Sequence, residues 1–167
     1  MIRYFDITAC VQFGFPFILD ELTQSEPAPD YLSETNGMKE LGKVLAFVQS
    51  DEYYSSFSEK SAYLICSIAG SQYFSNGNKR LSIVILLMFL LKNDVSVLRL
   101  DRSQYESVFY THFPTYTWED NIQITGTHQQ FLYNLSIVIG DRSHWGTDDF
   151  TVLRKKVASI FDQLYIR

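Results

Sequence analysis

The longest apolar run in the chain extends from Leu81 to Leu91 and is bounded by Arg80 and Lys92. Eleven residues are too few to cross a bilayer, so we expect no membrane partner. The run is apolar all round a helical projection, which is typical of a helix buried on nearly all sides. The pattern predicts a central helix over about residues 79–92, with the rest of the chain packed around it.

Apolar residues at three- and four-residue intervals predict further helices. They are expected over about 16–23, 38–48 and 61–69, after Asp101, after Thr127, and after Thr147 or Asp148. Ser58 is the expected N-cap of the third, and Asp101 with Gln104 and Thr127 with Gln130 resemble capping boxes. Residues 95–98 are expected to be briefly extended. The fold class predicted is all-α, with residues 1–167 as a single domain.

Composition supports a globular chain and narrows the partners. The 167 residues are 46% apolar and 16% aromatic, enough for a sizeable core. A net charge of −5 argues against nucleic acid, which requires a clustered basic surface; we interpret it as an ordinary soluble surface. Cys10 and Cys66 lie in apolar stretches and are expected to be reduced core residues. With no signal segment at the start of the sequence, this predicts a cytoplasmic location.

The candidate functional stretch precedes the central helix and runs from Gln72 to Arg80. The polar residues 75–78 are of types that favour turns, and Asn76 is a candidate N-cap for the helix that follows. Lys79 and Arg80 then place two positive charges in the first helical turn, where the helix dipole already presents a partial positive charge. Each misplaced charge costs a few tenths of a kcal/mol, up to about 1 kcal/mol. We infer a bound anion as the compensation, because free N–H groups beside Lys and Arg form a phosphate pocket.

These residues resemble a known family. Gly77, Asn78, Lys79 and Arg80, with Phe74 three residues before the glycine, are similar to the signature of Fic/Doc proteins, His-x-Phe-x-Asp/Glu-Gly/Ala-Asn-Gly/Lys-Arg. Lys79 resembles the Doc (death-on-curing toxin) branch rather than the adenylylating Fic branch. The resemblance implies a Fic/Doc-like helical bundle, a nucleotide-phosphate pocket at residues 77–80, and an inward-packed Phe74.

The resemblance is strongest over residues 36–98, where Asn36-Gly37-Met38 is similar to the family's second conserved block. It is absent after about 111, so residues 111–167 are extra C-terminal helices. It also places a target-binding flap, expected as a short β-hairpin, near residues 50–57 with Tyr53 and Tyr54. A plain solvated loop is an equal alternative there.

Two departures concern the chemistry itself. The family's catalytic histidine falls on Gln72, which cannot take a proton at neutral pH, and its metal-binding acid falls on Asn76. Losing a general base typically costs about 10²- to 10⁴-fold in rate. Asn76 offers Mg²⁺ only a neutral oxygen, so we expect no tight magnesium binding and assign no metal ligand.

His112, His128 and His144 share no ligand spacing, although one of them could still reach the pocket and replace the base. The aromatic loop 112–120 can be interpreted as a recognition surface or, as we favour, a packed connection.

Three functions remain open. The first is a toxin-type Fic/Doc-like protein that binds ATP or another nucleotide or phosphate compound but transfers poorly or not at all. It would act on a protein target or be controlled by a small antitoxin-like regulator. The second is an active transferase with altered chemistry, in which Gln72 orients the acceptor hydroxyl. The third is a non-catalytic helical interaction module.

Overall fold

A computed structural model describes residues 1–24, 26–145 and 148–167. The fold is predominantly helical, as predicted. The helical elements are α1 (Ile7–Ala9), the π-helical turn η1 (Cys10–Gly14), α2 (Phe15–Glu21), α3 (Thr35–Phe47), α4 (Phe57–Ala69), α5 (Asn78–Lys92), α6 (Arg102–His112), α7 (Thr127–Gly140) and α8 (Phe150–Leu164). Two short strands, β1 (Ser96–Val97) and β2 (Tyr165–Ile166), pair antiparallel.

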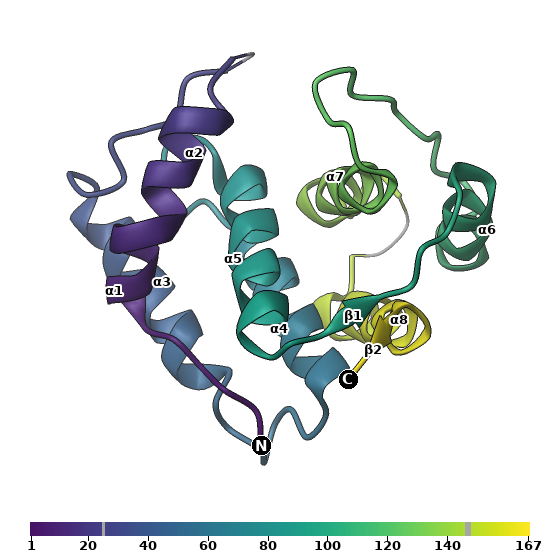
Figure 1. The fold of residues 1–167 in the computed structure, drawn as a ribbon, viewed down its shortest axis with the longest axis horizontal. Coiled ribbons are helices and arrows are strands. Elements are labelled where there is room, and N and C mark those ends of the chain that lie inside the picture. The colour runs from purple at the N-terminus through teal and green to yellow at the C-terminus, as the bar shows by residue number, and fades with distance from the viewer. Residues whose placement is uncertain (25, 146–147) are drawn as a thin grey trace.

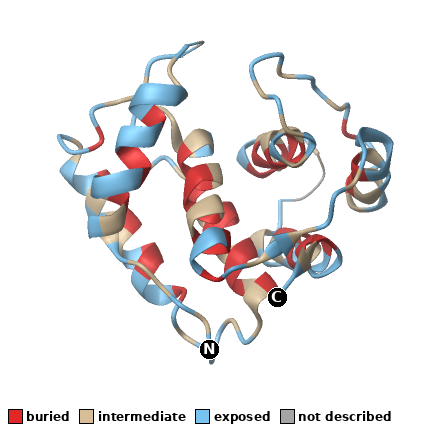
Figure 2. Ribbon diagram, viewed as in Figure 1, coloured by how far each residue is buried: buried red, intermediate tan, exposed pale blue. Residues whose placement is uncertain are grey.

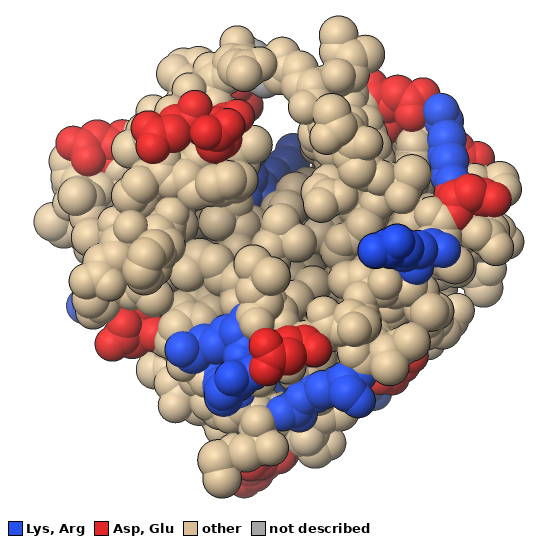
Figure 3. All heavy atoms as spheres, viewed as in Figure 1, with Lys and Arg blue, Asp and Glu red and all other residues tan. Residues whose placement is uncertain are grey.

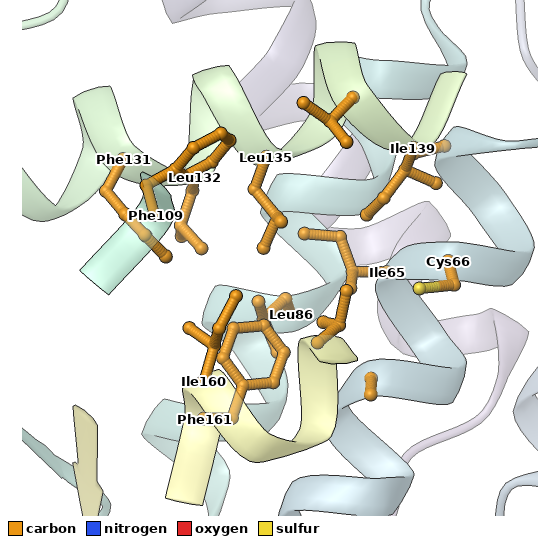
Figure 4. Close-up of a cluster of buried hydrophobic side chains, with 14 of the residues drawn as sticks. Ile65, Cys66, Leu86, Phe109, Phe131, Leu132, Leu135, Ile139, Ile160 and Phe161 are labelled. Atoms are coloured by element: carbon orange, nitrogen blue, oxygen red, sulfur yellow. The ribbon is translucent and has the colours of Figure 1, made fainter. Parts of the chain in front are cut away.

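Helices α4 and α5 lie in the middle of the molecule, between α1–α3 on one side and α6–α8 on the other (Figure 1). Both contribute to two apolar cores, one shared with the N-terminal helices and one with the C-terminal helices. Helices α2 to α8 accordingly carry buried residues on the sides that face their neighbours (Figure 2). In the C-terminal core, Ile65 and Leu86 meet side chains such as Phe161 of α8 and Leu135 of α7 (Figure 4). The central helix is therefore buried as predicted, within one residue of the expected bounds.

The N-terminal helical run begins earlier than predicted. Asp6 caps it by accepting a hydrogen bond from the Thr8 N–H, and helix continues to Glu21 rather than starting near Pro16. Pro16 has no backbone N–H, and the wider π turn immediately before it lets the chain stay helical through that gap.

The N-caps of α4, α7 and α8 differ from expectation. α4 is capped by Ser56, not Ser58, because Glu59 reaches back to the Ser56 N–H and completes a capping box. α7 has Gly126 at its N-cap, and the Gln130 side chain binds carbonyls of the preceding loop instead. Asp149 caps α8, whereas Thr147 lies outside the described residues. The Asp101–Gln104 capping box is confirmed.

Residues 50–57 do not form the expected β-hairpin. They are turns that lead directly into α4, and the strand pair lies elsewhere, between residues 96–97 and 165–166. The turn is fixed by Lys60, whose fully buried ammonium donates to the carbonyls of Val48 (2.9 Å) and Ser50 (3.3 Å). Because these two carbonyls accept hydrogen bonds from Lys60, they do not pair with a second strand of a β-hairpin.

The aromatic loop after α6 is a packed connection, as favoured. Phe113 and Tyr116 are buried in the C-terminal core. The buried Asn134 side chain accepts from the Tyr116 hydroxyl (2.6 Å) and the Glu119 N–H (2.8 Å), so α7 fixes the loop's path.

Candidate functional site

The loop between α4 and α5, residues 70–77, is called the motif loop below. It is held by the side chain of Asn78, the first residue of α5. Its Oδ1 accepts the Phe74 N–H (3.1 Å) and its Nδ2 donates to the Phe74 carbonyl (2.8 Å). Gly77, not Asn76, is the N-cap, with a left-handed φ of 76°. A Cβ on Gly77 would also lie 2.6 Å from the Tyr31 hydroxyl, so this position requires glycine. Asn78, predicted to bind phosphate, is thus occupied in shaping the loop.

Phe74 packs inward, as predicted. It is buried and makes edge contacts with Tyr31 (5.0 Å between ring centroids) and Phe15 (6.3 Å). Ser75, next to it, donates to the Glu34 carboxylate through its N–H (2.8 Å) and its hydroxyl (2.5 Å). The loop is therefore anchored to the segment before α3 and is pre-organised without a ligand.

Arg80 has protein partners. Its guanidinium donates to three backbone carbonyls, of Leu22 (2.8 Å), Glu26 (2.6 Å) and Pro27 (2.9 Å), and lies 3.9 Å from the Glu26 carboxylate. Helical side chains lean toward the N-terminus, which carries the guanidinium back to the loop after α2. The charge of Arg80 in the first helical turn is thus compensated by this loop.

Lys79 has no such compensation. It is exposed, and among the described residues no carboxylate lies within 4.0 Å of its ammonium. Its stem crosses Gly140 of α7, where an added Cβ would lie 2.6 Å from the lysine Cε. In the described part of the chain, the backbone N–H groups of residues 78–80 have no protein acceptor either. The start of α5 therefore presents one cation and three free donors on the same side of the molecule.

Asn78, Lys79 and Arg80 line a recess of about 400 Å³, the motif recess, between the motif loop, the end of α4 and α7. The residues lining it are Glu26, Ala69, Gly70, Ser71, Gln72, Ser75, Asn76, Gly77, Asn78, Lys79, Arg80, Ile83, Tyr133, Ser136, Ile137 and Gly140. An opening with basic atoms in its depth is visible between the N-terminal helices and α7 at the top of Figure 3. Of the charged lining side chains two are basic and one, Glu26, is acidic, so the recess favours an anion.

Gln72 and Asn76, the positions that the resemblance aligns with a catalytic histidine and a metal-binding acid, carry no basic or acidic side chain. Gln72 is exposed on the wall of the recess. Asn76 uses its Oδ1 to accept the Gly77 N–H (2.5 Å) and its Nδ2 to donate to the Pro27 carbonyl (3.0 Å). The oxygen that would face a metal ion is therefore already engaged.

The histidines do not line the recess. His128 is hydrogen-bonded to the Tyr165 hydroxyl (3.2 Å), and burial lowers its pKa to about 4. His112 packs near Lys156. Burial lowers the pKa of His112, and the positive charge of Lys156 lowers it to a lesser extent. His144 contacts the ring of Trp145. None of these three histidines is therefore placed to act as a base at this recess.

Tyr53 and Tyr54, the expected flap residues, line a different groove, between residues 53–59 and α8. Tyr54 stacks on Tyr63 (4.4 Å between centroids) and accepts a hydrogen bond from Arg154 (2.5 Å). Neither tyrosine lines the motif recess, so the structure does not bring these predicted residues together with residues 72–80.

Sequence reasoning missed the α7 wall, formed by Tyr133, Ser136, Ile137 and Gly140, and the loop residue Glu26. From the sequence alone, Gly140 indicates only the end of a helix. The small-polar spacing of Ser136 and Gly140 on one face of α7 was the available signal.

No protein-family model, curated protein or solved structure matches the chain. Among the residues that the structure describes, no helix has the length and apolar character needed to span a bilayer.

Proposed function

We propose that this chain is a toxin-type, Fic/Doc-like protein that binds a phosphate-bearing compound, ATP or another nucleotide being the class implied by the resemblance, in the motif recess. The observation that carries the proposal is the start of α5, where, among the described residues, the Lys79 ammonium has no carboxylate within 4.0 Å and the N–H groups of residues 78–80 have no protein acceptor. Residues 78–80 line a recess of about 400 Å³. A phosphate there would accept from backbone donors and a charge at once, which is how helix N-termini hold anions.

In this proposal Lys79 and Arg80 have different roles, and they do not both contact the phosphate. Lys79 and the backbone N–H groups contact the phosphate. Arg80 supports the loop that borders the recess, since its donors already reach three carbonyls. Asn78 keeps Gly77 and the following N–H groups in position through Phe74.

Transfer of a phosphoryl or nucleotidyl group is absent or weak in this proposal. The one carboxylate that lines the recess, Glu26, lies beside Arg80, and Gln72 cannot accept the proton of an acceptor hydroxyl. The protein would then act by binding, in the cytoplasm, on a protein target or under a small antitoxin-like regulator.

Thermal-shift titration with ATP, ADP, GTP and inorganic phosphate tests the binding. A ligand at about 100 times its Kd stabilises the folded state by about 2.7 kcal/mol, a rise of several degrees in Tm for a chain of this size. Lys79→Ala should abolish the rise. Lys92→Ala, which removes an exposed lysine from the other end of α5, is the matched control and should keep it. A full rise with Lys79→Ala would mean that the ligand binds elsewhere, and no rise with any compound would leave a helical interaction module.

Labelled ATP incubated with the protein and cell lysate separates binding from transfer. We expect no labelled target from the natural sequence. Gln72→His combined with Asn76→Asp should gain transfer if those two groups are all that is missing. Strong labelling by the unaltered protein would establish the alternative, an active transferase with changed chemistry.

A further inference from the structure

The negative charge of the protein is concentrated in one part of the chain. Residues 4–38 contain six acidic side chains and no lysine or arginine, whereas the remaining residues carry 13 acidic and 14 basic side chains. This segment comprises α1, η1, α2 and the loop before and at the start of α3. Acidic side chains accordingly gather over the α2 side of the molecule at the upper left of Figure 3, where the nearest blue atoms lie in the depth of the opening beside them.

The same segment exposes large apolar side chains. Phe13 is 66% exposed, and Phe17 and Leu19 are each 47% exposed. Phe13, Pro16 and Phe17 are three and four residues apart, so they follow one stripe on the solvent side of the helical run, opposite the buried Phe15 and Ile18. We call Phe13, Pro16, Phe17, Asp20 and Glu21 the α2 stripe.

The acidic end of the α2 stripe also breaks a local rule. Asp20 and Glu21 occupy the last turn of α2, where the helix dipole presents partial negative charge, and no basic residue shares that turn. Among the described residues no cation lies within 4.0 Å of either carboxylate. By contrast, Glu34 binds Ser75 and Glu26 lies beside Arg80. Asp20 and Glu21 are thus left without the compensation that Glu26 and Glu34 have.

We infer that the α2 stripe is a docking surface for a basic amphipathic helix of a partner protein. The apolar face of that helix would cover Phe13 and Phe17, and its flanking Lys or Arg side chains would pair with Asp20 and Glu21. Complementary charge on both the carboxylates and the helix dipole favours a basic partner over a neutral one.

Two other occupants fit the surface less well. A second copy of the chain would bring Asp20 and Glu21 against another acidic face in a two-fold interface. A bilayer surface rich in phosphate would repel the same carboxylates. The inference stands independently of the motif recess and of the nucleotide proposal.

The probe for the test is a fluorescein-labelled synthetic peptide of about 18 residues, five helical turns, built from Leu and Lys in amphipathic order. A second peptide has Glu in place of every Lys. We expect the Lys peptide to bind the full chain in fluorescence anisotropy, the Glu peptide not to bind, and binding to weaken as NaCl rises from about 50 mM to about 500 mM.

Substitutions locate the binding. We expect a rise of about tenfold in the Kd of the Lys peptide for Phe17→Ser, and a similar rise for the double variant Asp20→Lys with Glu21→Lys. The double lysine variant should also gain affinity for the Glu peptide. Controls on another surface are Ile122→Ser, at a residue 95% exposed, and Asp141→Lys with Asp162→Lys, and both should keep the original affinity within about twofold.

Three results would overturn the inference. One is no binding of the Lys peptide, or equal binding by the unaltered chain and the α2-stripe variants. Another is a dimer in analytical ultracentrifugation that Phe17→Ser disperses, since a second copy would then cover the stripe. The third is binding to phosphatidylcholine vesicles that Phe17→Ser abolishes, which would assign the stripe to lipid.

Discussion

Arg80 and Pro27 are joined by a hydrogen bond from the guanidinium Nη2 to the proline carbonyl, 2.9 Å long, across 53 residues of sequence. The same carbonyl accepts from the Asn76 side chain (3.0 Å), so the first turn of α5 and the motif loop hold one point of the loop after α2. The border of the motif recess is therefore built by side chains of the motif itself.

Arg80→Ala should destabilise the fold by about 2–4 kcal/mol, because three carbonyls lose a charged donor and the side chain is only 18% exposed. Urea unfolding followed by circular dichroism measures the change. Arg99→Ala, at an exposed position, should shift the free energy of unfolding by less than about 0.5 kcal/mol. Equal losses from the two variants would contradict the anchoring role of Arg80.

Gly77→Ala and Gly140→Ala should separate loop geometry from ligand binding. Gly77→Ala should cost about 2 kcal/mol or more, because an L-residue is strained at a φ of 76° and its Cβ would meet the Tyr31 hydroxyl. Gly140→Ala would meet the flexible end of Lys79 at 2.6 Å and the Ala69 carbonyl at an ordinary contact distance of 3.4 Å, so stability should change little while the ammonium is displaced.

In the thermal-shift assay, Gly140→Ala should therefore reduce the ligand-induced rise in Tm while keeping the ligand-free Tm within a few degrees of the unaltered chain. An unchanged rise would show that the position of Lys79 does not matter for binding.

Lys60→Met should destabilise the protein by about 2–4 kcal/mol, because the fully buried ammonium caps the carbonyls of Val48 and Ser50 at the end of α3. Its ion pair with Asp51 (2.9 Å) contributes much less, since that carboxylate is 81% exposed. Asp51→Asn should accordingly cost less than about 1 kcal/mol in chemical denaturation. A larger loss from Asp51→Asn than from Lys60→Met would place the energy in the ion pair instead.

The partly buried His128 should make the free energy of unfolding fall as the pH is lowered. Burial lowers its pKa to about 4, below the value of about 6.5 for an unfolded histidine, so the unfolded chain binds the extra proton first. The neutral His128 side chain contributes up to roughly 3 kcal/mol to the free energy of unfolding. This contribution is fully present above about pH 6.5 and is lost as the pH falls toward 4. Unfolding free energies measured every half pH unit should show this slope.

His128→Gln should flatten that slope, leaving the contribution of His112, whose pKa is also lowered by burial and by the charge of Lys156. A slope unchanged in His128→Gln would assign the acid sensitivity to other groups.

The two cysteines should be inert until the protein unfolds. Burial raises the pKa of the Cys10 thiol to about 12 and that of Cys66 further, and both side chains are inaccessible in separate cores. Iodoacetamide should label neither at pH 8 in the native protein and both in urea. Rapid native labelling of either would show local opening of its core.

Local patterns in the sequence were sufficient for most helices. The uninterrupted apolar run predicted α5 within one residue, because a helix buried on all sides needs no polar face. The Asp101–Gln104 capping box could also be predicted from the sequence, since a capping box depends on two residues three positions apart. The burial of Phe74 could be predicted because a large aromatic side chain in a turn next to a core helix tends to be buried.

Tertiary structure alone decided what surrounds the motif. The sequence indicated that Lys79 and Arg80 needed compensation, but not that Arg80 would find it in carbonyls 53 to 58 residues away, while Lys79 would lie over Gly140. Backbone carbonyls belong to every residue and so leave no trace in composition or spacing. Which of them a guanidinium reaches depends on how distant segments pack, and that same packing supplied α7 as the wall of the recess.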